Sequence, residues 1–361
     1  MISGADLKLA FLKLKFITRG LGISLGLGFF ALSCTQKPKL LEFQGQTMGT
    51  TYVVKYYPTA KTPSKPELAA KIDRALIDLN QKISNYIPDS EISQFNKSSS
   101  LEWQTPSLDL MAGLLQALDV GKKTNGIYDP TVGPLVALWG FGPRGPRTNK
   151  PEPSEIQALK AFVGLQHLEV SADKSQLRKL HPQVTLDYSS IGQGMGLNLM
   201  AKIMDEAGVE NSMLIVGGEI ITRGEKHDGP WRVAIEAPHK ERGIAQRQLI
   251  LGDRAICTSG NYRQFFEAEG KRYAHTIDPE TGIPVQHNLI SATIISPDSN
   301  ALFSDAWATA MLVVGPDKGP EIAEREGLIA YFIIEQEPGV YLEKFSSKWL
   351  ELYPDSEIHI P

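Results

Sequence analysis

The sequence predicts a mixed α/β protein built as one large unit or as two closely packed ones. Its 361 residues are too many for one small domain. With 42% hydrophobic and 22% charged residues, the chain can bury a sizeable core, which excludes global disorder. Segments with helical periodicity and segments with strand-like alternation follow one another along the chain, and this mixture sets the fold class.

The charge balance argues against a nucleic-acid-binding protein. The formal net charge is −4, the pI is near 6.0, and no basic stripe or run of Lys and Arg follows residue 40. Two cysteines cannot make a disulfide framework. We interpret Cys257 as a packing residue.

The N-terminal segment has the pattern of an export signal. Basic residues precede an apolar run, Leu21 to Leu32, which is too short for a comfortable membrane span. The run ends in Phe-Ala-Leu-Ser-Cys, which resembles a bacterial lipobox with Ala31 where Leu is usual. We expect lipidation at Cys34 and a membrane-anchored lipoprotein that faces the periplasm. The alternatives are an uncleaved anchor and a plain signal peptide. The expected layout is a signal peptide over 1–33, a tether over 34–43 and one domain over 44–361.

The first half of that domain alternates between strand and helix patterns. Residues 44–57 predict a strand entered through a turn at Gly49. An apolar stripe predicts a helix over 67–82, a Pro-Asp-Ser turn predicts a short helix from Glu91, and 108–124 predicts a long helix. Tyr86, just before the turn, could stack on a ring, although an aromatic side chain is more often part of the core.

A dense Gly, Pro and aromatic stretch over 125–145 follows the long helix. A rigid loop of this composition usually lines a site. The next run, 144–153, is predicted to be a surface connection and a possible boundary between two lobes.

A strand over 184–187, a glycine-rich turn and a helix over 197–207 predict an anion-binding site, since glycines let backbone N–H groups approach a phosphate. The glycines are spaced G-x-G-x-G, so the dinucleotide fingerprint fails by one residue. Glu219 lies near where the ribose-binding acid of that motif would fall. A nicotinamide site therefore stays as an alternative.

The second half predicts more strands. They cover 211–224, broken at Gly217 and Gly218 by a bulge, then 231–238, 255–266 and 271–285, the last leading into an Asp-Pro-Glu-Thr-Gly turn. His275 precedes that turn. By type it could relay a proton near neutral pH, although an isolated His is more often structural.

Small and apolar residues predict a helix over 301–314, closed by Gly315. Asp305 and Thr309 are four residues apart, so they lie on one helix face about 5–6 Å apart at Cβ. A carboxylate and a hydroxyl are hard oxygen donors that suit Mg²⁺. Alternatively, Asp305 only favours the helix dipole and Thr309 only bonds its own backbone.

Seven phrases stand in order along the chain: TMGTTY at 47–52, YIPDSEISQFN at 86–96, YDPTVGPLVALWGFG at 128–142, the turn over 186–196, TSGNY at 258–262, HTIDPETGIP at 275–284 and DAWAT at 305–309. Together they make this chain similar to the ApbE-like FAD:protein FMN transferase family. The resemblance runs from about Gln44 to Gly315. It implies a T-fold-like architecture, two interleaved lobes of mixed sheets with helices, and FAD in the cleft between them.

The resemblance implies an Mg²⁺-dependent enzyme that cleaves FAD, joins FMN through phosphate to a Thr or Ser of an acceptor protein, and releases AMP. An acceptor of this kind would be, for example, a subunit of a membrane redox complex. His275 is the implied base or proton relay. The implied metal positions are Asp305, Thr309 and the carbonyls of Ser190 and Ala308. The implied flavin contacts are Met48, Tyr86, Ile127, Tyr128, Asp129, Asp187, Gln193 and Ile277.

Two positions depart from the family pattern. Gln193 stands where many relatives have Lys, and a neutral amide donates a hydrogen bond but brings no charge. Asn198 replaces a frequent Asp. Two alternatives stay open: an FAD pyrophosphatase that gives free FMN and AMP, and a flavin-binding lipoprotein without turnover.

Overall fold

The computed structural model describes residues 39–143, 145–147, 149–238, 243–262, 265–268, 271–354 and 357–358. Residues 38–361 form one compact unit. The expected signal peptide and Cys34 lie outside the described residues. Within the described ranges, no helix is long and apolar enough to cross a membrane.

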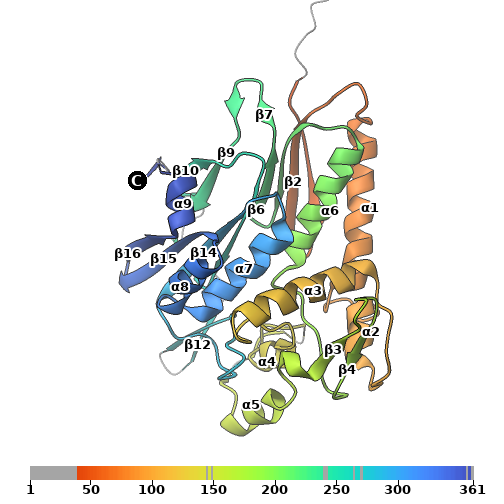
Figure 1. The fold of residues 1–361 in the computed structure, drawn as a ribbon, viewed down its shortest axis with the longest axis vertical. Helices are drawn as coiled ribbons and strands as arrows, with labels where there is room; N and C mark the ends of the chain where they lie inside the picture. The colour runs from red at the N-terminus through yellow and green to blue at the C-terminus, as the bar shows by residue number, and fades with distance from the viewer. Residues whose placement is uncertain are drawn as a thin grey trace, which may run out of the picture. The chain divides into compact units, whose positions relative to one another are not determined.

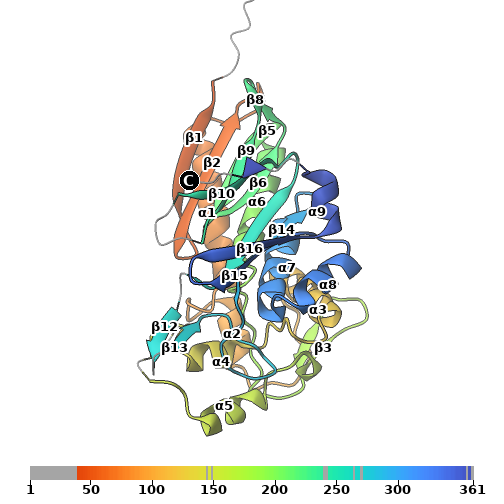
Figure 2. The same cartoon turned by 90° about the vertical axis from the view of Figure 1, so that its left-hand side faces the viewer.

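An eight-stranded sheet forms the centre of the unit (Figure 1, Figure 2). In spatial order its strands are β1 (Leu41–Thr47), β2 (Thr50–Tyr57), β5 (Asn211–Val216), β6 (Glu219–Arg223), β11 (Ala255–Gly260), β14 (Leu289–Ser296), β15 (Ile329–Glu337) and β16 (Val340–Phe345). Neighbouring strands of this sheet all pair antiparallel, whereas the family resemblance implied mixed sheets. The mixed α/β class is confirmed.

The helices are α1 (Lys65–Ile83), α2 (Glu91–Lys97), α3 (Leu108–Lys123), α4 (Gly133–Leu138), α5 (Pro153–Lys160), α6 (Gly192–Glu206), α7 (Ala301–Val314), α8 (Lys318–Arg325) and α9 (Ser347–Leu352). The short strands are β3 (Leu168–Val170), β4 (Leu177–Lys179), β7 (Glu225–Lys226), β8 (Gly229–Pro230), β9 (Arg232–Glu236), β10 (Ala245–Ile250), β12 (Phe265–Ala268), β13 (Lys271–Ala274) and β17 (Glu357–Ile358). A 3₁₀ turn covers Leu165–His167.

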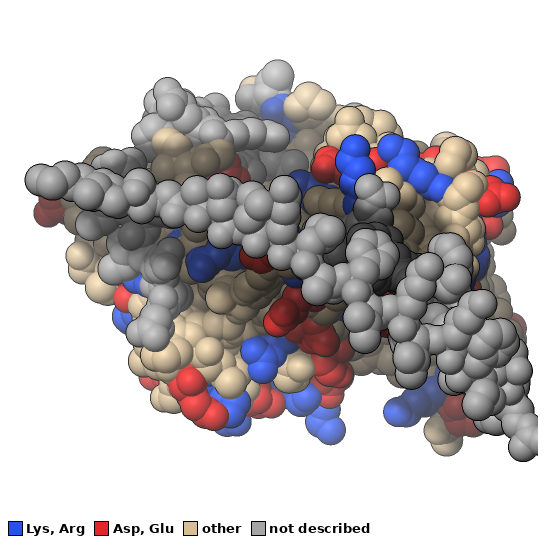
Figure 3. Space-filling model, turned by 90° about the horizontal axis from the view of Figure 1, so that it is seen from above, with Lys and Arg blue, Asp and Glu red and all other residues tan. Residues whose placement is uncertain are grey.

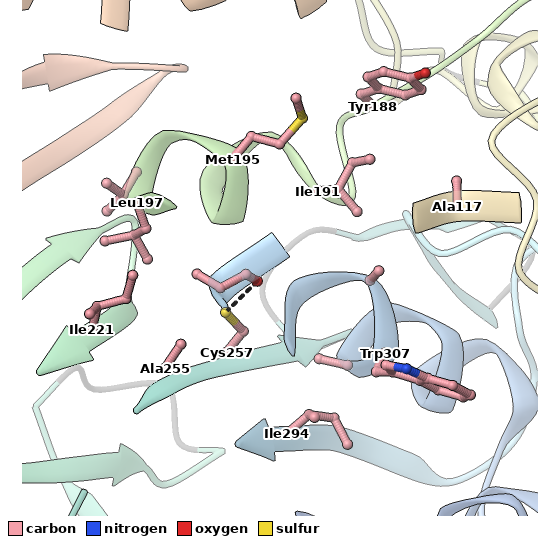
Figure 4. Close-up of a cluster of buried hydrophobic side chains, with 14 of the residues drawn as sticks. Ala117, Tyr188, Ile191, Met195, Leu197, Ile221, Ala255, Cys257, Ile294 and Trp307 are labelled. Carbon is pink, nitrogen blue, oxygen red and sulfur yellow. Dashed lines mark hydrogen bonds between the residues drawn. The ribbon is translucent and has the colours of Figure 1, made fainter. Parts of the chain in front are cut away.

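The main core lies between the sheet and the helices α1, α3, α6 and α7. Figure 4 shows part of it, with Trp307 of α7 above Ile294 of β14 and Cys257 of β11 beside α7. A second core on the other sheet face joins β9, β10 and α9 to the strands through Trp231, Tyr331 and Trp349. The sheet is therefore covered on both faces, which explains why β14 and β15 are almost continuously apolar.

The predicted helices over 67–82, 108–124 and 301–314 are confirmed within two residues at each end, and the short helix predicted from Glu91 begins at that residue. Gly315 follows the last of them with φ of 90°.

On the face seen in Figure 3, the described acidic and basic side chains are interspersed.

The predicted strand over 184–187 is wrong, because the backbone of this segment bonds the side chain of Asn96 and the carbonyl of Pro130 instead of a neighbouring strand. Asn96 accepts from the Leu186 N–H at 2.7 Å and donates to the Leu186 carbonyl at 2.8 Å. The Asp187 N–H donates to the Pro130 carbonyl at 2.7 Å. These long-range contacts hold the segment beside the loop after α3.

Three other boundaries are corrected. Gly217 and Gly218, with φ of 66° and 129°, form the two-residue turn of the β5–β6 hairpin and not a bulge. The strand predicted over 255–266 ends at Gly260 as β11, and a separate strand, β12, begins at Phe265. The predicted glycine-rich turn belongs to α6, which begins at Gly192 and not at Leu197.

The glycines of α6 let it pack tightly on α7. A Cβ at Gly194 would lie 2.5 Å from the Ala301 carbonyl oxygen and 2.9 Å from the Asp305 Cβ. A Cβ at Gly192 would meet its nearest atoms at 3.7 Å, an ordinary contact distance. The α6–α7 crossing therefore requires glycine at 194 but not at 192.

We predict that Gly194→Ala destabilises the protein by about 1–3 kcal/mol, because backbone atoms of α7 block the added methyl group. Gly192→Ala is the matched control, and its stability is expected to be unchanged or slightly higher. Urea unfolding in the presence of EDTA measures both. Equal stabilities for the two variants would contradict the packing argument.

Candidate active site

Helices α6 and α7 cap each other. The first N–H groups of a helix lack partners within it. The Gly194 N–H donates to Asp305 Oδ2 at 2.8 Å, and the Ala301 N–H donates to Asn198 Oδ1 at 2.8 Å. Asn198 Nδ2 also donates to Asn300 Oδ1 at 2.8 Å, and Asn300 caps α7. Asn198 thus uses both an acceptor and a donor, which an ionised Asp cannot do.

Oxygen atoms from four segments converge beside this crossing. Thr309 Oγ1 lies 3.5 Å from the Ser190 carbonyl oxygen and 2.9 Å from Ser259 Oγ. Tyr128 OH lies 2.9 Å from Ser190 Oγ. The structure therefore brings Ser190 and Thr309 together, with Asp305 one turn earlier on α7. Ala308 is fully buried within that helix.

Ser259 was not among the residues expected at the site. It lies near the end of β11, in the Thr-Ser-Gly phrase at 258–260. The phrase itself was the only sequence signal for it. Its contact with Thr309 places the end of a central strand at the site.

The charges of three acidic side chains act on the phenol of Tyr128. Burial raises its pKa, and the charges of Asp305, Asp187 and Asp129 raise it further. Asp129 Oδ1 accepts from the backbone and side chain of Thr131, both at 2.7 Å. Asp187 Oδ1 accepts from Ser189 in the same way, at 2.8 and 2.6 Å. Hydrogen bonds within their own turns therefore hold the carboxylates of Asp129 and Asp187 in position.

Tyr86 is 60% exposed, so it is not a core residue. Its hydroxyl donates to the Phe141 carbonyl at 3.2 Å, and its pKa is raised by burial and by Asp187. The ring of Phe141 lies 6.2 Å from that of His275, edge to face. Tyr86 and His275 are therefore linked through Phe141 on the Asp187 side of the site.

The remaining expected flavin contacts, Met48, Gln193, Ile127 and Ile277, lie on four separate segments. Met48 lies in the β1–β2 turn with φ of 50°, and its side chain reaches the α6 glycines. Gln193 lies against Gly217 in the β5–β6 turn. Ile127 is half-buried in the loop beside Tyr128. Ile277 is buried in a separate apolar cluster with Trp139.

Asp305 and Glu219 are two buried carboxyls with raised pKa values. Burial raises the pKa of Asp305 to about 7, against the lowering effect of the Gly194 N–H. Burial, and then the charge of Asp305, hold the pKa of Glu219 well above its usual range. The Cys257 thiol donates to the Ala301 carbonyl at 3.5 Å and is fully buried, as a packing residue is expected to be (Figure 4).

The nicotinamide alternative is wrong. A dinucleotide site needs a strand, a helix and a parallel strand. Here α6 leads into β5, and β5 pairs antiparallel with both of its neighbours. Glu219 follows a hairpin turn, where no βαβ unit exists among the described residues.

The donor set fits a hard cation. It comprises the Asp305 carboxylate, the Thr309 hydroxyl and the Ser190 carbonyl, all of which are oxygens that Mg²⁺ accepts. The described residues hold no cluster of three or more His, Cys, Asp or Glu side chains that could bind a metal ion, so a cation here would depend on hydroxyl and carbonyl oxygens beside Asp305.

Residues 48–333 match the sequence model of the ApbE family. The chain belongs to the ApbE family. The FAD:protein FMN transferase of Haemophilus influenzae is 37% identical over 351 residues, covering 95% of this chain and 99% of that protein. The Escherichia coli protein of the same name is 39% identical over 325 residues, covering 86% and 91%.

Solved structures of ApbE proteins share the fold. The flavin transferase ApbE from Vibrio cholerae superposes with a TM-score of 0.79 at 36% identity, covering 87% of this chain and 99% of that one. The apo flavinyl transferase ApbE from Pseudomonas stutzeri gives 0.80 at 33% identity, covering 88% and 98%. The family resemblance predicted from the seven phrases is confirmed.

The raised pKa of Asp305 predicts a pH-dependent stability. Its pKa rises from 3.8 to about 7 on folding, so the folded chain binds this proton more tightly than the unfolded chain. The resulting stabilisation is full below about pH 4 and is lost as the pH rises toward 7. Asp305→Asn keeps an oxygen for the Gly194 N–H but cannot ionise.

We therefore expect the metal-free Asp305→Asn variant to lose less stability than the wild type between about pH 5 and pH 8. Urea unfolding in EDTA at several pH values measures the free energy of unfolding of each. If the free energy of unfolding fell equally with pH in both proteins, the ionisation of Asp305 would not be the cause of the pH dependence.

Proposed function

We propose that this chain is an FAD:protein FMN transferase that joins FMN through a phosphoester bond to a Thr or Ser of an acceptor protein and releases AMP. Curated relatives with this activity align with nearly the whole chain. The observation that carries the proposal is the convergence of Ser190, Asp305 and Thr309 beside Tyr128 and Asp187.

Mg²⁺ is the proposed cofactor. Asp305, Thr309 and the carbonyl of Ser190 would hold it, and the cation would offset the negative charge that develops when the FAD pyrophosphate is cleaved. Asp305 suits this role because its carboxylate is buried and receives one neutral hydrogen bond, from Gly194. Ala308 is kept as a proposed carbonyl ligand.

Gln193 is proposed to act at the start of α6. Its amide lies against the β5–β6 turn and can donate a hydrogen bond to a phosphate oxygen. Because it carries no charge, neutralisation of the pyrophosphate would depend more on the cation and on backbone donors. Met48, Tyr86, Ile127, Tyr128, Asp129, Asp187 and Ile277 are kept as proposed flavin contacts.

His275 is the proposed base for the acceptor hydroxyl. The hydroxyl oxygen attacks the FMN phosphorus, the bond to the AMP oxygen breaks, and the hydroxyl proton passes to His275. The position of His275 supports this role, because its ring lies beside Phe141, whose carbonyl accepts from Tyr86.

The decisive experiment incubates the chain from residue 35 onward with FAD, Mg²⁺ and an acceptor domain that carries a flavinylation-type Thr. We expect the acceptor to gain the mass of FMN, with release of AMP, and EDTA to block both. FMN and AMP with an unmodified acceptor would favour an FAD pyrophosphatase. Intact bound FAD would favour a flavin-binding protein without turnover.

Asp305→Ala is expected to abolish Mg²⁺-dependent transfer, because it removes the carboxylate from the proposed set of Asp305, Thr309 and the carbonyls of Ser190 and Ala308. Asp228→Ala, whose side chain is 78% exposed, is the matched control and should keep full activity. Initial rates of acceptor labelling compare the two. Full activity of Asp305→Ala would rule out the metal assignment.

His275→Ala is expected to slow transfer by about 10²–10⁴-fold, the usual contribution of a general base, while FAD binding changes little. Single-turnover labelling and a separate FAD titration measure the two effects. An equal loss in both would assign His275 to flavin binding.

We also propose that Cys34 is lipidated and anchors the mature protein to a membrane facing the periplasm, near a membrane-bound acceptor. The lipobox-like run before it supports this proposal. Cys34→Ser should move the protein from the membrane fraction to the soluble fraction after cell disruption. An unchanged distribution would favour an uncleaved anchor.

A further inference from the structure

Glu219 is a buried carboxylate that the proposed mechanism does not use. It begins β6, directly after the Gly217–Gly218 turn, and is 7% exposed. Its Oε2 is buried and has no hydrogen-bond partner among the described residues. A buried polar atom of this kind is costly, so its presence calls for a ligand or a partner.

The neighbouring carboxylates accept hydrogen bonds, whereas Glu219 Oε2 accepts none from the described residues. Asp129 and Asp187 each accept two hydrogen bonds from their own turns. Asp305 accepts one from the Gly194 N–H. The free oxygen of Glu219 is therefore not a general property of this acidic region.

The sheet directs Glu219 toward Asp305. Alternate residues of a strand share a face, so Glu219 points to the same side as Ile221, which packs in the core beneath α6 and α7. Ile221 pairs with Ala255 and Ile220 with Ile256, and the same register continued by one more pair brings Cys257 opposite Glu219. The Cys257 thiol contacts α7 at Ala301.

The charges around Cys257 agree with a position of Glu219 near Asp305. Burial raises the pKa of the Cys257 thiol, and the charges of Asp305 and Glu219 raise it further, so both carboxylates lie near its sulfur. Neither carboxylate forms an ion pair with Lys or Arg in the described part of the chain. Burial favours the protonated forms of both carboxyls, and a divalent cation beside them would supply the positive charge that lets both ionise.

We propose that Glu219 is a further acidic residue of the cation site, and that its Oε2 binds the cation held by Asp305 or a water of that cation's coordination shell. The inference rests on the proposed metal dependence of the transferase. It assigns to Glu219 a share in cation affinity, in addition to the ligands that the family resemblance implied. A supporting residue of this kind typically changes metal affinity by about 10–100-fold.

The test measures cation binding directly, without FAD or acceptor. Metal-free protein is titrated with Mn²⁺ by electron paramagnetic resonance and with Mg²⁺ by calorimetry. Glu219→Gln is expected to weaken both affinities about 10–100-fold. Glu225→Gln, an exposed acid on the adjacent β7, is the matched control and should bind as the wild type does.

A purely structural role for Glu219 gives a different result. In that case Glu219→Gln would lower the Tm in EDTA, while the increase in Tm on adding Mg²⁺ would equal that of the wild type. We expect the reverse: a Tm in EDTA close to the wild-type value and a smaller increase with Mg²⁺. Unchanged Mn²⁺ affinity in Glu219→Gln would overturn the inference.

Two further results separate the inference from the proposed function. If the wild type binds neither Mn²⁺ nor Mg²⁺, the metal dependence itself fails. If Glu219→Gln does not fold, Glu219→Asp is measured in its place. This variant keeps a carboxylate, but its side chain is one methylene shorter, so the carboxylate lies farther from the proposed cation. We expect Glu219→Asp to weaken Mn²⁺ binding at least about threefold, less than the 10–100-fold loss expected for Glu219→Gln; wild-type affinity would count against the proposal.

Discussion

The hydrogen bond from the Gly194 N–H to Asp305 Oδ2 is the contact on which the site depends. It joins two residues 111 positions apart and forms only because α6 and α7 approach closely at a glycine. The return contact from Ala301 to Asn198 fixes the axial position of α7 relative to α6. Together these two caps determine where Asp305 and Thr309 stand, and therefore where hard oxygen ligands can gather.

The crossing of α6 and α7 also determines how readily the buried carboxyls ionise. It places Asp305 in a buried environment with one neutral donor, and this explains a pKa raised to about 7. Glu219 enters the same region from the sheet. In an apolar interior such charges are unfavourable unless they are neutralised. The proposed catalytic cation would provide that neutralisation, so folding energy and function would be linked at one place.

The sheet supplies the rigid support. β6 and β11 lie in the middle of the strand order, and both sheet faces are covered. Glu219 begins one of these strands and Ser259 lies near the end of the other. The residues proposed to contact flavin, by contrast, come mostly from turns and loops: the β1–β2 turn, the loop after α3 and the segment before α6. The helix α7, supported by the central strands, thus holds Asp305 and Thr309 of the proposed ligand set, while connecting segments supply Ser190 and line the rest of the site.

The sequence alone determined the helix over 301–314, with Asp305 and Thr309 on one face, because an unbroken run of small and apolar residues and a closing Gly315 are local properties. It also determined the family, since seven phrases recur in order. Only the tertiary structure decided that α6 begins at Gly192, because glycines are poor helix formers and the acceptor that caps them comes from Asp305. The same is true of the segment over 184–187, which Asn96 holds, of Ser259, whose partner Thr309 lies on α7, and of Glu219, which feels the charge of Asp305 from another element. Local pattern predicts what neighbours in sequence do; contacts between distant residues are set when the core assembles.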